Sequence, residues 1–160
     1  MIDNNNKADK HVVSATAVIP ARQERVYALI ANYHEGHPRI LPRQLSGLVV
    51  EEGGVGAGTV IRFQMSVLGK KQTFRAAITE PEPGRVLVET DLDTNGAVTT
   101  FTVDPGTAPA NSRVTISTML AVRSGLLGVL EKQMATLLLR PMYKKELENL
   151  ARVATGPFAL

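Results

Sequence analysis

The residues most able to do chemistry gather in one short stretch, YHEGHPRILP, which runs from Tyr33 to Pro42. It holds two of the three histidines of the chain, His34 and His37, together with Tyr33 and Arg39. Histidine is the commonest general acid or base in enzymes, and two histidines on one helical face can bind a metal ion. The stretch is therefore a candidate for acid–base catalysis, for a metal site or for contacts with a ligand.

The glycine and the first proline of this stretch argue against a metal site. Gly36 is expected to end the preceding helix in a left-handed conformation, and Pro38 disfavours helical backbone at His37. His34 then falls in the last helical turn, where a partly positive imidazole complements the helix dipole. No third ligand follows at an obvious spacing. We therefore predict no metal and no cofactor, and expect the two histidines to serve the structure or to contact a ligand.

Other catalytic or phosphate-binding motifs are missing from the sequence. The stretch GGVGAGT, residues 53–59, lacks the Gly-Lys-Ser/Thr ending of a phosphate-binding loop and precedes a predicted strand, so we interpret it as a hairpin turn. No nucleophile-elbow signature accompanies the serines. The absence of cysteine excludes disulfides and a cysteine nucleophile, and it fits a reducing compartment.

The overall composition is that of a small globular domain. The chain has 160 residues, of which 44% are hydrophobic and 21% charged, enough for one domain with a real core. The net charge of +3 comes from scattered basic residues, and only 4% of the residues are aromatic, which argues against a nucleic-acid partner. There is no signal peptide and no run of about 18 apolar residues, so we expect a cytoplasmic protein without a transmembrane segment.

Hydrophobic periodicity predicts the elements that must position these residues. β-branched residues predict a strand over 11–19, and apolar residues at helical spacing over 21–36 predict an amphipathic helix. The proline-bracketed segment 38–42 suggests a short second helix. Six strands at hairpin spacing then follow, over 47–52, 59–68, 72–79, 85–92, 97–103 and 113–122.

A long helix over about 125–153 closes the chain. Its first half, GLLGVLEKQMATLLL, is apolar on most sides, which predicts burial against the sheet or a partner. Flexible tails are expected at 1–10 and 155–160, around a single domain at 11–154. The order β-α-α, six strands and α predicts an α+β fold, in which a curved antiparallel sheet wraps around the long helix.

Alternation along the strands predicts which side chains face that helix. One parity is apolar and is expected to face inward: Ile61, Phe63, Met65, Val67, Phe74, Ala76, Ile78, Val86, Val88, Leu92, Phe101, Val103, Val114, Ile116 and Leu120. The other parity is polar and is expected to face water: Arg62, Gln64, Arg75, Glu89, Asp91, Thr100, Arg113 and Ser117. The polar members expected inside are hydroxyls: Thr90, Thr99, Thr118 and Tyr33. A wall with almost no titratable group suits an apolar small molecule better than acid–base catalysis.

Three stretches carry a resemblance to a known superfamily: ATAVIPARQERVYALIANY at 15–33, GVGAGTVIRF at 54–63 and LLRPMYKKELENLARVA at 138–154. With the order of elements, they make the chain from about His11 to Ala154 resemble the SRPBCC superfamily of helix-grip proteins. That superfamily includes START lipid-transfer domains, pollen-allergen-type proteins and the polyketide cyclase/dehydratase group. The resemblance implies a deep cavity between the sheet and the C-terminal helix, open near the segment that joins the first two helices. It does not select one function, because this fold hosts transporters, cyclases, hydrolases and chaperone regulators.

The leading hypothesis from the sequence is a cavity that binds a small hydrophobic ligand, lipid-, polyketide- or isoprenoid-like. The expected contacts are Phe63, Met65, Phe74, Val88, Phe101, Ile116, Leu130, Met134 and Leu138, with Tyr33 and His37 near the mouth. One alternative is an enzyme of the polyketide cyclase/dehydratase type, in which Tyr33, His37 or Arg39 supplies the polar catalysis. The other is a protein-interaction module that uses the apolar start of the long helix as an interface, with a homodimer as one form of it.

Overall fold

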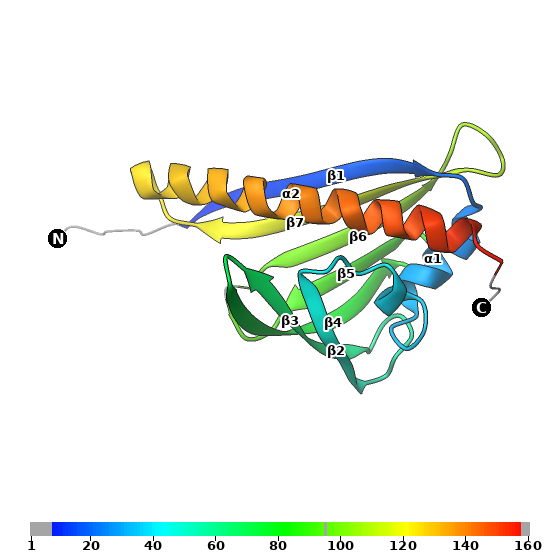
Figure 1. The fold of residues 1–160 in the computed structure, drawn as a ribbon, viewed down its shortest axis with the longest axis horizontal. Coiled ribbons are helices and arrows are strands. Elements are labelled where there is room, and N and C mark those ends of the chain that lie inside the picture. The colour runs from blue at the N-terminus through cyan, green and yellow to red at the C-terminus, as the bar shows by residue number, and fades with distance from the viewer. Residues whose placement is uncertain (1–7, 95, 158–160) are drawn as a thin grey trace.

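One antiparallel sheet of seven strands forms a curved layer, in the order β1-β7-β6-β5-β4-β3-β2 (Figure 1). The strands are β1 (Asp9–Ile19), β2 (Leu45–Glu52), β3 (Val60–Val67), β4 (Lys70–Glu82), β5 (Val86–Asp91), β6 (Val98–Pro105) and β7 (Ser112–Val122). This computed structural model describes residues 8–94 and 96–157. Consecutive strands from β2 to β7 are neighbours, and β1 pairs with β7, so the first strand of the chain lies beside the last.

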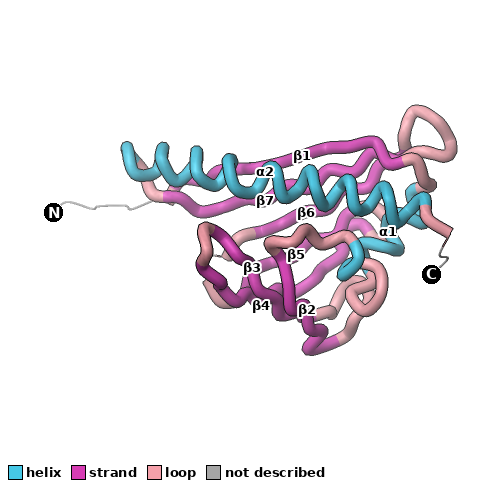
Figure 2. Tube along the Cα trace, viewed as in Figure 1, coloured by secondary structure: helices cyan, strands magenta, loops and turns pink. Residues whose placement is uncertain are grey.

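In the described part of the chain, two α-helices and one turn of 3-10 helix complete the fold: α1 (Gln23–Ala31), η1 (His37–Arg39) and α2 (Gly125–Thr155). α2 runs lengthwise across the sheet, closest to β1, and its C-terminal end reaches α1 (Figures 1 and 2). The predicted α+β helix-grip fold is thereby confirmed. The second predicted helix, over 38–42, is reduced to the three residues of η1.

The predicted tails fall mostly on residues 1–7 and 158–160, which lie outside the described part of the chain. Asp9 and Lys10 were expected in the first tail but belong to β1, because β7 extends far enough to pair Asp9 with Val122. At the other end, α2 continues through Thr155.

A single apolar cluster joins the sheet to the second half of α2. Val13 of β1 and Val114 of β7 are fully buried, as are Leu147 and Leu150 of α2. Burying one such side chain stabilises the fold by about 1.5–3 kcal/mol. The buried positions of α2 recur at helical spacing between Met142 and Ala154, so this half of the helix is held against the sheet.

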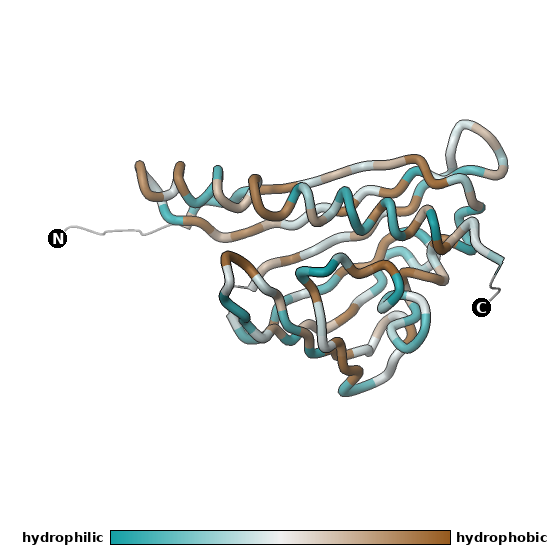
Figure 3. The backbone as a smooth tube through the Cα atoms, in the orientation of Figure 1, coloured by the Kyte–Doolittle hydropathy of each residue, from teal (hydrophilic) through white to brown (hydrophobic). Residues whose placement is uncertain are grey.

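The first half of α2 has a different environment. Most of it is hydrophobic apart from one polar turn, as Figure 3 shows, yet these apolar side chains are exposed: Leu126, Leu127, Val129, Leu130, Met134 and Leu137. Leu126 is 90% exposed and Leu127 is 57% exposed. Within this chain, therefore, the sheet does not cover the start of α2. Among the described residues, no helix is both long enough and apolar enough to cross a membrane.

Gly36 ends the first helical region in a way that the sequence did not indicate. Its φ is −83°, so the predicted left-handed conformation is wrong, and α1 stops earlier, at Ala31. The Asn32 carbonyl accepts the N–H of His37 at 2.7 Å, which turns the chain back on the helix. A Cβ at position 36 would lie 2.3 Å from the carbonyl oxygen of Leu29. Glycine is needed here because two backbone segments come into contact.

Candidate functional site

A cavity of about 420 Å³ lies between the inner face of the sheet and α2. This volume is within the roughly 300–1,000 Å³ that is usual for small-molecule sites. Most of its wall is apolar: Leu41, Leu45, Leu48, Ile61, Phe63, Met65, Phe74, Ala76, Ala97, Phe101, Leu120, Leu139 and Met142. Phe63 and Phe74 are partners across β3 and β4, and their rings stack with centroids 5.7 Å apart. They present aromatic surface to anything that enters.

The structure brings some of the predicted ligand residues to this wall and leaves others away from it. His37, Phe63, Met65, Phe74 and Phe101 line the cavity. The predicted residues that do not line it are Tyr33, Val88, Ile116, Leu130, Met134 and Leu138. Tyr33 and Ile116 are each 1% exposed and lie in the packing behind the wall.

The three predicted residues of α2 come too early in the helix. Leu130 and Met134 belong to the exposed first half, and Leu138 is only half-buried. α2 reaches the cavity with the next turns, through the set Leu139, Met142, Tyr143 and Glu146. The apolar composition of the first half of the helix predicted its burial, yet the sheet covers the more amphipathic second half.

The predicted inner face of β5 is wrong, and the correction places carboxylates in the cavity. Glu89 pairs with Ile78 of β4, which is buried, and with Thr99 of β6. The residues of β5 that face inward are therefore Leu87, Glu89 and Asp91, whereas Val88 and Thr90 face outward. The three residues at 86–88 are apolar at both parities, so alternation alone could not identify the face.

His37 lies at the inner wall in a fixed orientation. Its Nδ1 is 2.8 Å from the carbonyl oxygen of Ile30. A carbonyl only accepts, so we assign the proton to Nδ1 and leave Nε2 directed at Glu89, 3.7 Å from its Oε1. The ring stacks on Tyr33 at 4.4 Å and meets the edge of Phe101 at 5.6 Å. The side chain is thus held for contact through Nε2.

Tyr33 supports this arrangement from behind the wall. Its hydroxyl donates a 2.6 Å hydrogen bond to Oε1 of Glu89. Burial, together with the negative charge of Glu89, raises the pKa of Tyr33 well above its ordinary value. The tyrosine therefore remains a donor and fixes the carboxylate beside His37. The other histidine of the stretch, His34, is exposed and packs against Gly54, away from the cavity.

Glu146 is the second carboxyl of the inner wall, and it comes from α2. It is 3% exposed and lines the cavity. No hydrogen bond or ion pair joins its carboxyl to another described residue, and its oxygens remain accessible from the cavity. Burial, and after it the nearby charge of Glu89, raises the pKa of Glu146 well above its ordinary value. The protonated form of Glu146 is therefore favoured, and in that form the carboxyl has an O–H to donate.

A short chain of hydroxyls runs beside these carboxyls. Tyr143 of α2 hydrogen-bonds Thr118 of β7, and Thr118 in turn lies 2.7 Å from the hydroxyl oxygen of Thr99. All three line the cavity. Burial raises the pKa of Tyr143 to about 12, so it stays protonated. The cavity thus combines an apolar wall with a cluster of polar groups drawn from η1, three strands and α2.

Sequence reasoning predicted Thr99 and Thr118 on the inner face but missed Tyr143 and Glu146. A signal for both was present. Glu146 comes four residues after Met142 and three after Tyr143, and Leu147 comes four after Tyr143, so the two polar residues occupy the same helical stripe as buried apolar ones. A carboxylate in such a stripe is uncommon unless it serves a site.

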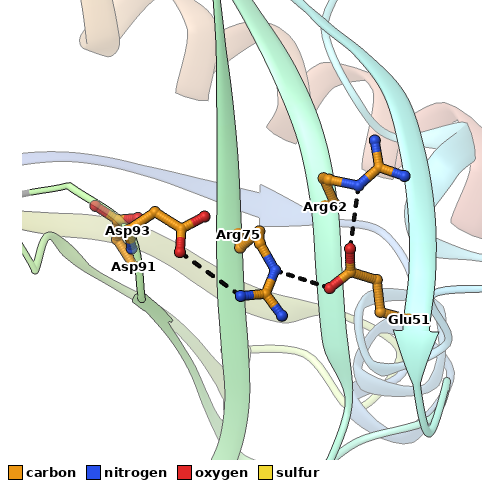
Figure 4. Close-up of polar contacts among 5 residues, drawn as sticks. All are labelled: Glu51, Arg62, Arg75, Asp91 and Asp93. Atoms are coloured by element: carbon orange, nitrogen blue, oxygen red, sulfur yellow. Dashed lines mark hydrogen bonds and ion pairs between the residues drawn. The ribbon is translucent and has the colours of Figure 1, made fainter.

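Glu51 of β2 is the centre of the ion pairs that link the strands at this end of the sheet. Glu51 accepts from Nε of Arg62 at 3.0 Å and from Nε of Arg75 at 2.8 Å, and Arg75 also lies 3.6 Å from Asp93 (Figure 4). These hydrogen bonds raise the pKa of Arg75 and lower that of Glu51. Arg75, which contributes to the cavity lining, is thereby occupied by two carboxylates of the protein.

Among residues 8–94 and 96–157, no three His, Asp or Glu are grouped so as to hold a metal ion.

Comparison with known proteins identifies the relatives of this chain. The profile of the family described as polyketide cyclase / dehydrase and lipid transport matches residues 10–155. The solution structure of the KanY protein is 30% identical, with a TM-score of 0.80 over 92% of this chain and 99% of that one. No curated protein matches this sequence.

Two more distant structures share the fold. The Zhui aromatase/cyclase from Streptomyces sp. R1128 is 16% identical, with a TM-score of 0.75 over 91% of this chain and 94% of that one. A START superfamily protein from Mycobacterium smegmatis is 18% identical, with a TM-score of 0.73 over 91% and 99%. The family profile spans nearly every element described above, from β1 to the end of α2. The chain belongs to the polyketide cyclase / dehydrase and lipid transport family, within the SRPBCC superfamily of START-related helix-grip proteins.

Proposed function

We propose that the protein binds a small, largely apolar molecule in the cavity between the sheet and α2. The observation that carries this proposal is the 420 Å³ volume, whose wall is aromatic and aliphatic except for one polar cluster. Membership of the family supports a hydrophobic-ligand-binding or cyclase role. The stacked pair of Phe63 and Phe74 favours ligands with flat rings, such as aromatic polyketide-like molecules, over single alkyl chains.

The main driving force for binding would be the transfer of apolar ligand surface out of water. At about 25 cal/mol per Å², a ligand that buries roughly 200 Å² of apolar surface gains ~5 kcal/mol. Part of this gain is offset by the lost freedom of the ligand. We therefore expect affinity to depend chiefly on how well the ligand fills the cavity, with polar contacts deciding which ligand is preferred.

Filling the cavity with a larger side chain tests this proposal. Ala76 lines the cavity, whereas its neighbour Ala77 faces the opposite side of β4, so Ala76→Phe and Ala77→Phe form a matched pair. The neutral dye N-phenyl-1-naphthylamine, which fluoresces in apolar surroundings, is titrated into each protein. We expect Ala76→Phe to weaken dye binding at least about tenfold, equivalent to ~1.4 kcal/mol, and Ala77→Phe to leave it near the wild-type value.

Melting temperatures measured alongside establish that both variants fold. If folded Ala76→Phe binds the dye as tightly as wild type, the dye site lies elsewhere and the proposal fails. Native mass spectrometry of the protein purified from its own host then reads the mass of the natural ligand directly.

A cyclase- or dehydratase-like enzyme is a second candidate function, and the orientation of His37 favours it. With Nδ1 bonded to Ile30, Nε2 is available to take a proton from a carbon beside a ligand carbonyl. Glu146 can donate its proton to the carbonyl oxygen, so the C–H bond breaks and an enol forms. Tyr33 holds Glu89 and acts as a positioning residue, while Arg39 is exposed on η1 and does not line the cavity.

Proton exchange provides a test of this second function that does not require the natural substrate. The ketone 2-acetonaphthone is incubated with protein in D₂O, and NMR follows the replacement of its methyl protons by deuterium. We expect wild type to accelerate the exchange and His37→Asn to lose at least about tenfold of that acceleration. His34→Asn, which changes the exposed histidine of the same stretch, is the matched control and should keep it. Equal acceleration by wild type and His37→Asn would remove His37 from this role.

A further inference from the structure

The charged groups of the cavity are mostly acidic. Glu89, Asp91 and Glu146 supply three carboxyl groups, and among the described residues Arg75 is the only lysine or arginine that lines it. The guanidinium of Arg75 is engaged by Glu51 and Asp93. Among the described lining residues, therefore, no lysine or arginine is left to neutralise the carboxylate of a ligand. A fatty acid or another anion would enter a site whose net field repels it.

Glu146 determines which polar group a ligand should carry. The residue is 3% exposed and lines the cavity, and no hydrogen bond or ion pair joins its carboxyl to another described residue. Its oxygens are not sealed off in the packing but remain accessible from the cavity, so a ligand there can complete the hydrogen bond that the carboxyl lacks. Glu146 is close enough to Glu89, Tyr33 and Tyr143 for their charges to interact, and it shares the cavity lining with His37.

We propose that this cavity selects neutral ligands that carry a carbonyl-type oxygen, which accepts a hydrogen bond from Glu146, and that it rejects carboxylates. The proposal rests on the proposed ligand-binding function and narrows it: the ligand is a ring-bearing ketone, aldehyde, quinone or ester rather than a free fatty acid. Glu146 acts as donor and Glu89 excludes anions. The hydrophobic part of the ligand then lies along the phenylalanine wall.

Electrostatics agree with this geometry. Glu146 interacts electrostatically with Glu89 of β5, Tyr33 and Tyr143, and it shares the cavity lining with His37, Arg75 and Asp91. Burial and the charge of Glu89 both raise the pKa of Glu146, which favours the protonated, hydrogen-bond-donating form. As pH rises through that raised pKa, the donor is lost and a second negative charge appears. Ketone binding should therefore weaken with rising pH.

Four probes with one naphthalene skeleton test the selection. These are 2-acetonaphthone, 2-ethylnaphthalene, 2-naphthoate and 2-(aminomethyl)naphthalene, which differ as ketone, hydrocarbon, anion and cation. Their affinities are measured by displacement of N-phenyl-1-naphthylamine at pH 7. One net hydrogen bond corresponds to a factor of roughly 3 to 10 in affinity. We expect the ketone to bind more tightly than the hydrocarbon by that factor, and the carboxylate to bind at least about tenfold more weakly than the ketone.

Two substitutions assign the selection to Glu146. Glu146→Leu removes the donor, so the ketone should lose its advantage over the hydrocarbon. Glu146→Gln keeps an N–H donor but cannot ionise, so the ketone advantage should persist and its decline with pH should disappear. Melting temperatures show whether each variant folds, and the pH dependence in wild type gives a reading that needs no variant.

The outcomes separate this inference from the function on which it rests. If neither the hydrocarbon nor the ketone displaces the dye, cavity binding itself fails. If the hydrocarbon binds as tightly as the ketone, or if the carboxylate or the amine binds best, the cavity binds ligands but the carbonyl selection is wrong. A ketone advantage that survives in folded Glu146→Leu overturns the role of Glu146.

Discussion

The position of the His37 side chain is determined by backbone contacts around it. The backbone of Gly36 lies against that of Leu29, which folds the chain back. The Nδ1–H of His37 then donates a hydrogen bond to the carbonyl of Ile30. His34, three residues earlier, is left in solvent. Both histidines look alike in the sequence, where residue type and spacing are visible but a backbone contact is not. A histidine whose tautomer is fixed and whose other nitrogen faces a cavity is a candidate for ligand contact or catalysis.

Glu146 gives the clearest residue-scale prediction, which concerns stability against pH. Its pKa is raised in the folded protein, so the folded state holds the proton more tightly than the unfolded chain does. Its contribution to stability is complete below the unfolded pKa of about 4.3 and is lost as pH rises toward the folded pKa, at no more than roughly 1.4 kcal/mol per pH unit. In Glu146→Gln this loss disappears, so the variant should gain on wild type as pH rises.

Urea unfolding of both proteins between about pH 4.5 and about pH 8 measures this difference. Glu148→Gln, an exposed glutamate two residues later in α2, is the matched control and should follow the wild-type profile. Parallel stability profiles for wild type and Glu146→Gln would mean that Glu146 ionises as an ordinary surface carboxyl does.

At the scale of elements, β5 and α2 show why some faces could be predicted and others could not. β7 alternates strictly, and the predicted inner residues Val114 and Ile116 are buried. β5 begins with three apolar residues in a row, so only its pairing with β4 decides which of them faces inward. In α2 the ligand contacts were predicted in the hydrophobic first half, but the curved sheet covers the second half.

The exposed start of α2 yields the element-scale prediction. Its apolar side chains form a patch of the kind that marks an interaction surface, and a homodimer through this face is our expectation. Sedimentation should then show a concentration-dependent dimer for wild type and a monomer for Leu127→Asp. Val18→Asp changes a β1 residue that is 58% exposed, against 57% for Leu127, and should leave the dimer intact. A wild-type protein that stays monomeric at every concentration would contradict the dimer.

At the scale of the whole molecule, the order of strands and helices could be predicted because local signals agree. Hairpin turns, alternation and one long amphipathic segment all favour a single sheet under a single helix. The content of the cavity could not be predicted in the same way. Whether space remains between sheet and helix depends on the summed side-chain volumes and on curvature, and the polar cluster requires β5, η1 and α2 to meet in three dimensions. The apolar wall residues Phe63 and Phe74 could be predicted from alternation, and Glu146 could have been found from its place in a buried helical stripe, whereas the orientation of Glu89 depends on strand pairing.

Ligand binding should also be visible as a property of the whole fold. A ligand that binds only the folded state stabilises it by about 2.7 kcal/mol when its free concentration is about 100 times its Kd. In a domain of this size, 1 kcal/mol raises the Tm by roughly 2–4 °C, so saturating N-phenyl-1-naphthylamine should raise the Tm by about 5–11 °C. Differential scanning calorimetry measures the shift. Ala77→Phe should show it in full and Ala76→Phe should not, because only the latter fills the cavity. A shift of equal size in Ala76→Phe would place the stabilising site outside the space between the sheet and α2.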